Sequence, residues 1–184
     1  SEAFSPGRDD FRLRKTLLTL YDFIRSHPFP EQWLRKVAGF YDSSLPVAET
    51  VWGKTMLSYG EEVLTYCCQM LQSALTLCEE DQKLYDKFSP VLAIELEQAK
   101  ALKKLAEEKN WDRLSSGLQG AAFGVLRSPA GYKDDPLKVR ICAARDEAKA
   151  TLKSLAVPFS LTEGECQEDL ARMAPLVEKL FECV

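Results

Sequence analysis

The chain has 184 residues, a hydrophobic fraction of 46% and a formal net charge of −4. This composition excludes wholesale disorder, and the acidic balance excludes a surface that is basic all round, so a nucleic-acid contact would need a local patch. The N-terminus lacks the apolar core of a signal peptide, and no run of about 18 apolar residues occurs. We therefore expect a cytoplasmic protein that has no membrane partner.

Two helices are predicted at the start of the chain. Apolar residues recur at helical spacing from Phe11 to Ile24, and the proline-flanked segment 27–30 ends this pattern. Pro30 suits the first position of the second helix, which carries Trp33 and Leu34 on its apolar side.

The longest regular pattern covers about residues 47–82 and predicts one long helix. Its large apolar residues follow one another in steps of four and three, which is typical of a seam that packs helix on helix. Trp52, Tyr59, Tyr66 and Met70 could line a pocket, but the periodicity favours a core. The predicted seam consists of Trp52, Met56, Tyr59, Val63, Tyr66, Met70, Ala74 and Leu77.

The second half of the chain predicts four further helices and one main loop. The loop is rich in glycine and proline and covers residues 117–136. The first three of these helices are expected to start at Ser89-Pro90, at Trp111 and at Asp135-Pro136. The last helix is expected to start after Ser160 or Thr162 as the N-cap, with Glu163 or Glu165 as the second residue of a capping box.

No segment shows sustained strand alternation, so we predict an all-α fold, an irregular bundle of about six or seven helices. We expect a single helical subdomain over residues 1–184, with a possible subdivision near the 117–136 loop. The chain begins with Ser1 and ends on an apolar helical pattern without a stop signal, which favours excision from a larger multidomain protein.

The sequence contains no recognisable catalytic, cofactor-binding or metal-binding motif. It has no phosphate-binding loop or dinucleotide fingerprint, and its single histidine, His27, lies in a proline-flanked turn. The adjacent glutamate pairs point about 100° apart on a helix, so they do not converge on a ligand. No cysteines form a C-x-x-C pair, and in an apolar helix a cysteine behaves as a small hydrophobe. The six cysteines are Cys67, Cys68, Cys78, Cys142, Cys166 and Cys183.

One basic cluster is a candidate for contact with DNA. Several of its members recur at spacings of seven and four, as expected for a stripe along one helix that meets backbone phosphates. An ordinary charged outer face explains the pattern equally well, and both interpretations stay open. The cluster consists of Arg127, Lys133, Lys138, Arg140, Arg145, Lys149 and Lys153.

Three stretches together resemble the AddA/RexA family, the first subunit of the bacterial ATP-dependent helicase/nuclease and a UvrD/RecB-like helicase. The first stretch is LTLYDFIRSHPFPEQWL (18–34), the second RSPAGYKDDPLKVRICAARDEAKATLKSL (127–155) and the third MAPLVEKLFE (173–182). The resemblance covers about residues 8–184. The family string of the first stretch gives structural roles to Leu20, Tyr21, Phe23, Ser26, His27, Pro28, Pro30, Trp33 and Leu34.

This resemblance implies an inserted helical subdomain of the 1B type. The parent protein would be an enzyme, an ATP-dependent DNA helicase and 3′–5′ exonuclease of double-strand break repair. It would use ATP and Mg²⁺ as cofactors and would pair with a second subunit. The ATP-binding and nuclease motifs are absent here, so no catalytic or cofactor-binding residue is carried over. The fragment would contact double-stranded DNA or the second subunit.

Two alternatives remain from the sequence. The apolar seam between Trp52 and Leu77 could belong to a freestanding helical protein–protein interaction module. A bundle that binds a small ligand or a metal would need polar residues inside its core, and no matching set is found. The oligomeric state is left open.

Overall fold

The computed structural model describes residues 9–41 and 44–182, with side chains for 14–41 and 44–179. The described residues form seven α-helices and two short 3₁₀ helices and contain no strand, which confirms the all-α prediction. They divide into two compact units, residues 1–44 with 167–184, and residues 45–166. Cys183 and the predicted apolar positions Phe11 and Leu13 lie outside the residues whose side chains are described.

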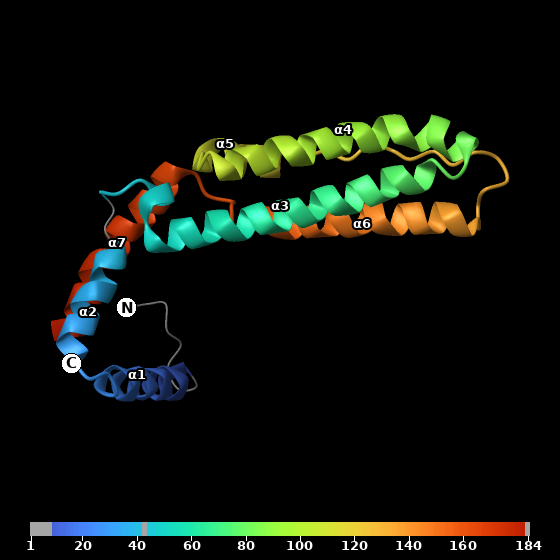
Figure 1. The fold of residues 1–184 in the computed structure, drawn as a ribbon. Helices are drawn as coiled ribbons and strands as arrows, with labels where there is room; N and C mark the ends of the chain where they lie inside the picture. Colours follow the sequence, from blue (N-terminus) through green and yellow to red (C-terminus); the bar gives the residue numbers. More distant parts are fainter. Residues whose placement is uncertain (1–8, 42–43, 183–184) are drawn as a thin grey trace. The chain divides into compact units, whose positions relative to one another are not determined.

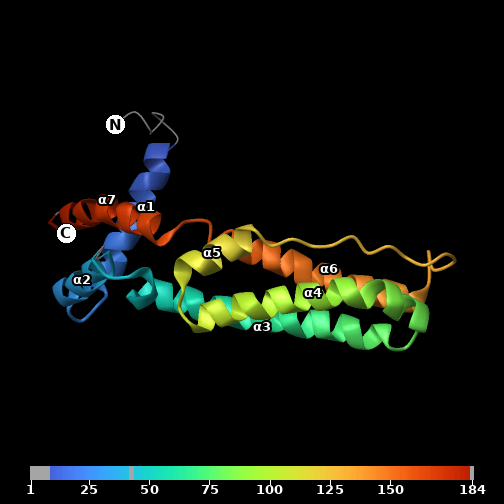
Figure 2. The same ribbon diagram turned by 90° about the horizontal axis from the view of Figure 1, so that it is seen from above.

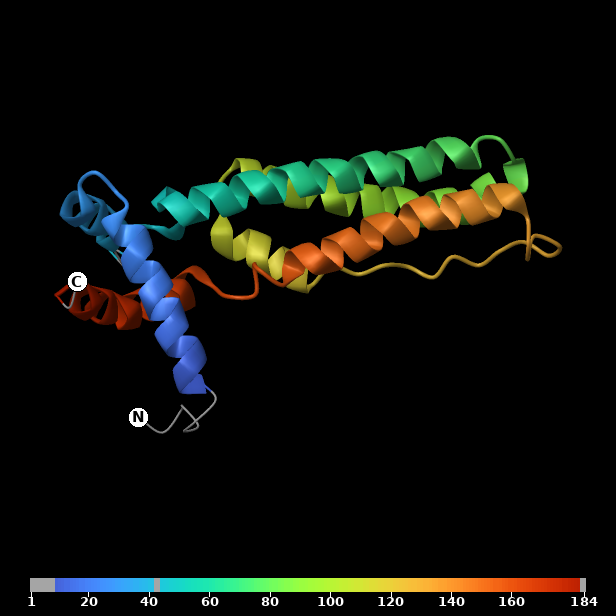
Figure 3. The same cartoon turned by 90° about the horizontal axis from the view of Figure 1, so that it is seen from below.

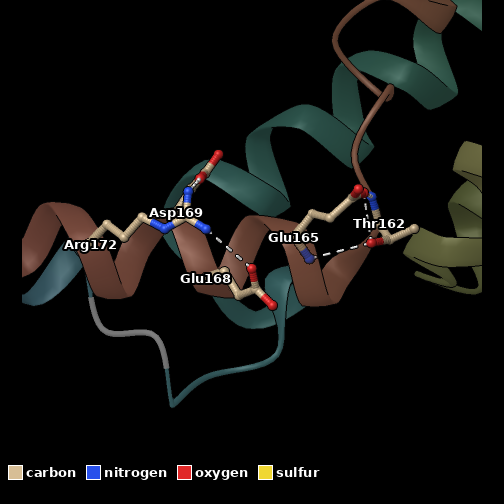
Figure 4. A network of polar contacts seen from close by, with 5 residues as sticks. All are labelled: Thr162, Glu165, Glu168, Asp169 and Arg172. Atoms are coloured by element: carbon tan, nitrogen blue, oxygen red, sulfur yellow. Dashed lines mark hydrogen bonds and ion pairs between the residues drawn. The ribbon is translucent and has the colours of Figure 1, made fainter.

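The first unit contains α1 (Asp9–Arg25), α2 (Pro30–Ala38), a 3₁₀ turn (Gly39–Tyr41) and most of α7 (Glu163–Glu182). Pro30 occupies the first turn of α2, as the sequence predicts. α7 begins with the predicted capping box (Figure 4): the Thr162 N–H donates to Glu165 at 2.8 Å, and the Glu165 N–H donates to the Thr162 hydroxyl at 3.3 Å. The Thr162 N–H and the Thr162 hydroxyl both donate to the Glu165 carboxylate, and these two bonds lower the pKa of Glu165.

The second unit is a bundle built around α3 (Val51–Cys78). This helix packs against both α4 (Gln82–Glu107) and α6 (Pro136–Ala156) (Figure 1). The short helix α5 (Trp111–Gln119) packs against α4 and α6. α4 runs back antiparallel to α3 after a short turn. α6 also runs antiparallel to α3, so it is parallel to α4 (Figures 1 and 3).

A parallel pair of helices requires a connection that returns along the whole bundle. Residues 121–135, hereafter the crossover, make this return between α5 and α6. They carry no helix, and Figures 2 and 3 show them extended beside the helices. The predicted glycine- and proline-rich loop is therefore an extended strap that lies inside the second unit.

Two helix starts differ from the sequence-based expectation. α4 begins at Gln82, not at Ser89-Pro90, because Asp81 caps it by accepting the N–H groups of Lys83 at 2.8 Å and Leu84 at 3.0 Å. Pro90 lies inside α4. The long helix starts at Val51 after a separate 3₁₀ turn, η2 (Val47–Glu49), and Thr50 caps it through the Gly53 N–H at 3.0 Å.

The buried stripe of α3 lies one residue later than the predicted seam at every position except Ala74, which belongs to both. Tyr59 and Tyr66 are 53% and 40% exposed, and several other predicted members are only half-buried at the edge of the core. Glycines and cysteines let the neighbouring segments approach closely along the true stripe. The buried stripe consists of Gly53, Leu57, Gly60, Leu64, Cys67, Leu71, Ala74 and Cys78.

α3 thus packs its buried stripe against both α4 and α6. The stripe that packs within the chain shares only Ala74 with the predicted seam, and Tyr59 and Tyr66 of that seam stay exposed. Burial raises the pKa of the Cys67 thiol to about 12 and that of Cys78 to about 11, so both stay protonated at neutral pH. They act as small apolar core residues, as predicted from the sequence.

Gly53 makes the closest approach in the bundle, and its replacement tests the packing. A Cβ at this position would lie 1.8 Å from the Val47 carbonyl oxygen. We expect Gly53→Ala to lower the free energy of unfolding by about 1–3 kcal/mol, measured by urea denaturation, because the 3₁₀ turn must shift. Gly164→Ala is the matched control: its Cβ meets nothing within 4 Å. The control should leave stability unchanged or raise it by up to about 1 kcal/mol. An equal loss in both variants would contradict the close-approach argument.

Candidate nucleic-acid interface

The predicted basic cluster lies on the crossover and on α6. Residues 121–156 hold seven lysines and arginines against four aspartates and glutamates, in a chain whose net charge is −4. This excess of positive charge is what a local phosphate contact needs. The structure distributes the seven side chains over three different environments.

Arg145 lies in the interior of the second unit. Its side chain is 8% exposed, and it forms an ion pair with Glu95 of α4, whose side chain is 2% exposed. Arg145 Nε donates to Glu95 Oε2 at 2.8 Å, and Nη2 donates to Oε1 at 2.6 Å. These hydrogen bonds raise the pKa of Arg145. The guanidinium is thus engaged inside the bundle and is not presented to a phosphate.

The same ion pair holds the crossover in place. The Gly124 N–H donates to Glu95 Oε1 at 2.8 Å, and the Gly124 carbonyl oxygen accepts from Arg145 Nη2 at 2.5 Å. The Phe123 ring lies under two cations, 5.8 Å from the Arg145 guanidinium carbon and 5.6 Å from Lys149 Nζ. A Cβ at Gly124 would lie 2.7 Å from Val91 Cγ1, so the backbone approaches α4 closely.

The far end of the crossover is fixed to the start of α4. The Tyr132 hydroxyl donates to Asp81 Oδ2 at 2.8 Å, and the same carboxylate caps α4. The Tyr132 hydroxyl is the main cause of a lowered pKa of Asp81. Lys138 Nζ donates to the Lys133 carbonyl oxygen at 2.9 Å, which ties the first turn of α6 to the crossover.

Arg140 lies on a different face from the lysines. Nine residues separate it from Lys149, and at about 100° per residue the two side chains point to opposite sides of α6. On the side of Arg140, Glu147 accepts a 3.5 Å hydrogen bond from the exposed Tyr66 hydroxyl of α3. Arg140 is exposed but does not share a surface with Lys149.

Of the remaining five basic residues, Arg127 and Lys133 belong to the crossover, Lys138 and Lys149 contact it, and Lys153 lies one turn of α6 beyond Lys149. Lys138 and Lys149 are half-buried, while the other three are exposed. On α6, Lys138, Lys149 and Lys153 lie within about 60° of one another around the axis. We call this set the crossover lysine edge: Arg127, Lys133, Lys138, Lys149 and Lys153.

The residues of the 18–34 string build a small aromatic cluster in the first unit. The His27 and Trp33 rings stack at 4.6 Å between centroids with an interplanar angle of 15°, and Phe23 meets both edge-on at 5.1 and 5.6 Å. Ser26 donates to the Phe23 carbonyl at 2.6 Å, and Leu34 is buried. Leu20 and Pro30 are half-buried, whereas Tyr21 and Pro28 are exposed.

The sequence patterns did not single out Glu95, Phe123 or the Tyr132–Asp81 pair as site residues. Glu95 occupies a position on the apolar stripe of α4, three residues after Leu92 and four before Ala99, both of which are buried. Arg145 lies likewise between Ile141 and Ala148 on the buried stripe of α6. A charged residue that is fully buried on an apolar helix face almost always has a partner of opposite charge. Their positions on apolar stripes could therefore have predicted that Glu95 and Arg145 form an ion pair.

No group of three or more histidine, cysteine or acidic side chains in the described part of the chain is arranged to hold a metal ion. None of the described helices is long and apolar enough to cross a membrane.

Comparison with known proteins identifies homologues over the whole chain. The A subunit of the ATP-dependent helicase/nuclease from Acetivibrio thermocellus is 29% identical over all of this chain and 15% of its own length. The proteins of the same name from Natranaerobius thermophilus and Bacillus pumilus are each 28% identical, again over the whole chain and 15% of the relative. No family model matches the chain. The chain thus spans about 15% of the length of these relatives.

Replacement of Arg145 tests the buried pair. Arg145→Met leaves the Glu95 carboxylate buried without its cation, so we expect a loss of about 3–5 kcal/mol in the free energy of unfolding, measured by chemical denaturation. Lys149→Met makes the same chemical change one helical turn later, where the cation only lies over Phe123, and should cost about 1 kcal/mol or less. A Glu95→Leu/Arg145→Met double variant should recover part of the loss. Equal losses for the two single variants would show that Arg145 is not a buried partner.

Replacement of Tyr132 tests the anchor at Asp81. We expect Tyr132→Phe to move the pKa of Asp81 up toward its usual value, because the main cause of the lowered pKa is removed. A carboxyl with a lowered folded-state pKa stabilises the fold above its unfolded-state pKa, and this contribution is lost as the pH falls through the folded-state pKa. The stability difference between the two proteins should therefore shrink in acid. Carboxyl-carbon NMR titration measures the pKa, and Tyr85→Phe, which removes an exposed hydroxyl of α4, should not change it.

Proposed function

We propose that this chain is a noncatalytic helical part of an ATP-dependent helicase/nuclease, since it is homologous over its whole length to a segment of that enzyme's A subunit. The observation that carries the proposal is the match of the entire chain to only 15% of the relatives. The segment would be the inserted helical subdomain of the 1B type, within a DNA-repair complex. ATP and Mg²⁺ would bind elsewhere in the whole protein, because this chain has no phosphate-binding loop.

The segment's own contribution would be a contact with double-stranded DNA through the crossover lysine edge. Two cations lie on the extended strap and two lysines of α6 contact it, and the three lysines of the set on α6 share one flank of the helix. Backbone phosphates are bound by such arrays without reading the base sequence. Arg145 is excluded from the contact by its pairing with Glu95, and Arg140 by its position on the opposite side of α6.

Charge reversal on the lysine edge tests this contact. Lys149→Glu/Lys153→Glu should weaken binding of a blunt-ended duplex, measured by fluorescence anisotropy at low salt. It should also reduce the slope of log K against log salt by about 0.9 for each phosphate that is no longer bound. The matched control is Lys54→Glu/Arg140→Glu, which makes the same change in net charge away from the edge and should bind as the unaltered chain does.

Two results would contradict the DNA contact. One is no measurable binding of the unaltered chain even at low salt. The other is an equal loss of affinity in both double variants, which would mean that only the total charge matters. Thermal unfolding of both variants checks that the fold is retained.

A further inference from the structure

The aromatic cluster of the first unit borders a pocket at the corner between α1 and α2. The pocket has a volume of about 320 Å³, at the lower end of the range that is usual for small-ligand sites. Its residues come from the proline-flanked turn after α1 and from the first two turns of α2. The pocket is lined by His27, Pro28, Phe29, Gln32, Trp33 and Lys36.

Aromatic rings form a large part of the pocket. The rings of His27 and Trp33 stack on each other, so they form a fixed flat group. Phe29 lines the same pocket and is 67% exposed. An exposed ring offers a face on which another planar ring can stack. The pocket therefore suits a planar aromatic ligand.

Two polar groups of the pocket have no partner among the described residues. The Nε2 atom of His27 is buried and forms no hydrogen bond. The side chain of Gln32 is exposed, and its amide bonds no other described residue. Buried polar groups in native proteins almost always have a partner. A ligand with hydrogen-bonding groups on the edge of its ring would provide one, which a phenyl ring cannot do.

Lys36 adds a positive charge to the pocket. Among the described residues it forms no ion pair, because the Glu31 carboxylate lies 4.0 Å from Arg35 instead. The surrounding segment is also basic: residues 14–41 hold five lysines and arginines against two aspartates and glutamates. The charge therefore favours a ligand that carries an anionic group.

We propose that this pocket binds one unpaired nucleotide of a nucleic-acid strand. The base would stack on Phe29 beside the His27–Trp33 pair, and its polar edge would face the imidazole nitrogen and the Gln32 amide. The neighbouring phosphate would meet Lys36. Exposed aromatic rings on a basic surface are the usual combination for holding single strands. The duplex contact is a separate matter, because it uses the second unit and paired DNA.

An acidic peptide with an aromatic side chain is a poorer occupant. Its carboxylates could meet Lys36, and its ring could stack on Phe29. A tyrosine or tryptophan side chain carries only one polar group, however, so either His27 Nε2 or the Gln32 amide would stay without a partner.

The indole N–H signals of the ¹⁵N-labelled 184-residue chain test the proposal. The chain has three tryptophans, and Trp52 and Trp111 belong to the second unit, so the Trp33 signal reports on the pocket. The probe is a thymidine tetranucleotide. The comparison ligands are a tetranucleotide without bases and the tripeptide Glu-Tyr-Glu. The thymidine strand should shift the Trp33 signal alone, and the comparison ligands should not shift it.

A first pair of variants tests stacking. Phe29→Ala removes the exposed ring and should weaken binding of the thymidine strand about tenfold. Leu18→Ala removes an apolar side chain of α1 that is 61% exposed, and it should leave the affinity unchanged. If Phe29→Ala lowers the melting temperature, Phe29→Leu keeps the apolar bulk without the ring and should show the same loss of affinity.

A second pair of variants tests the phosphate contact. Lys36→Gln should lower the affinity and reduce the slope of log K against log salt by about 0.7, the value for one phosphate of a single strand. Lys15→Gln removes an exposed cation of α1 outside the pocket and should change neither quantity.

Several outcomes would overturn the proposal. These are no shift of the Trp33 signal with the thymidine strand, an equal shift with the strand that lacks bases, and equal losses of affinity in Phe29→Ala and Leu18→Ala. A shift with the tripeptide as large as that with the thymidine strand would assign the pocket to a protein partner instead. Failure of the duplex contact would leave the Trp33 response intact, so the two ideas fail separately.

Discussion

The second unit depends on one buried interaction, the ion pair between Glu95 and Arg145. Two charged side chains that are almost fully buried are costly unless each remaining hydrogen-bonding position is filled. Here the pair is completed by the backbone of Gly124, which donates to the carboxylate and accepts from the guanidinium. One carboxylate, one guanidinium and one glycine thus join α4, α6 and the crossover at a single point.

This junction explains how the bundle holds two parallel neighbours. α4 and α6 both run antiparallel to α3, so the chain must return along the bundle between them. An extended strap without its own ladder has backbone groups that need partners on the buried side. The side chains of Glu95 and Arg145 provide those partners at Gly124, and Tyr132 fixes the far end to Asp81. A Cβ at this junction would lie 2.7 Å from Val91 Cγ1, so any larger residue would have to displace the Val91 side chain.

The sequence predicts the helices better than it predicts how they pack. Local chemistry encodes the fold class, the starts of α2, α5, α6 and α7, and the capping box at Thr162. These predictions are confirmed. Two predictions are wrong because they rest on large or distinctive residues and not on the residues that cap or pack the helix. Pro90 suggests a helix start although Asp81 offers a better cap. Tyr59 and Tyr66 suggest the seam of α3, whereas the buried stripe runs mostly one position later and combines leucines with glycines and cysteines.

The candidate interface shows the same limit more sharply. Spacing along α6 groups Arg145 with the lysines, and sequence alone cannot say that a glutamate fifty residues earlier faces it across the bundle. The pairing depends on the direction of α6 and on the path of the crossover, and both are tertiary properties. Only the position of Glu95 and Arg145 on apolar stripes could have signalled that they are partners.

The burial of Arg145 limits the DNA contact that we propose. Five cations remain around the crossover, and two of them, Lys138 and Lys149, already contact a carbonyl oxygen or an aromatic ring of the chain. Each phosphate contact adds affinity mainly through counterion release, so a handful of cations gives weak binding that falls steeply with salt. The net charge of −4 opposes the approach of DNA from other directions. If the segment meets a duplex, it would therefore orient DNA that other parts of a larger protein hold, and it would add little binding energy of its own.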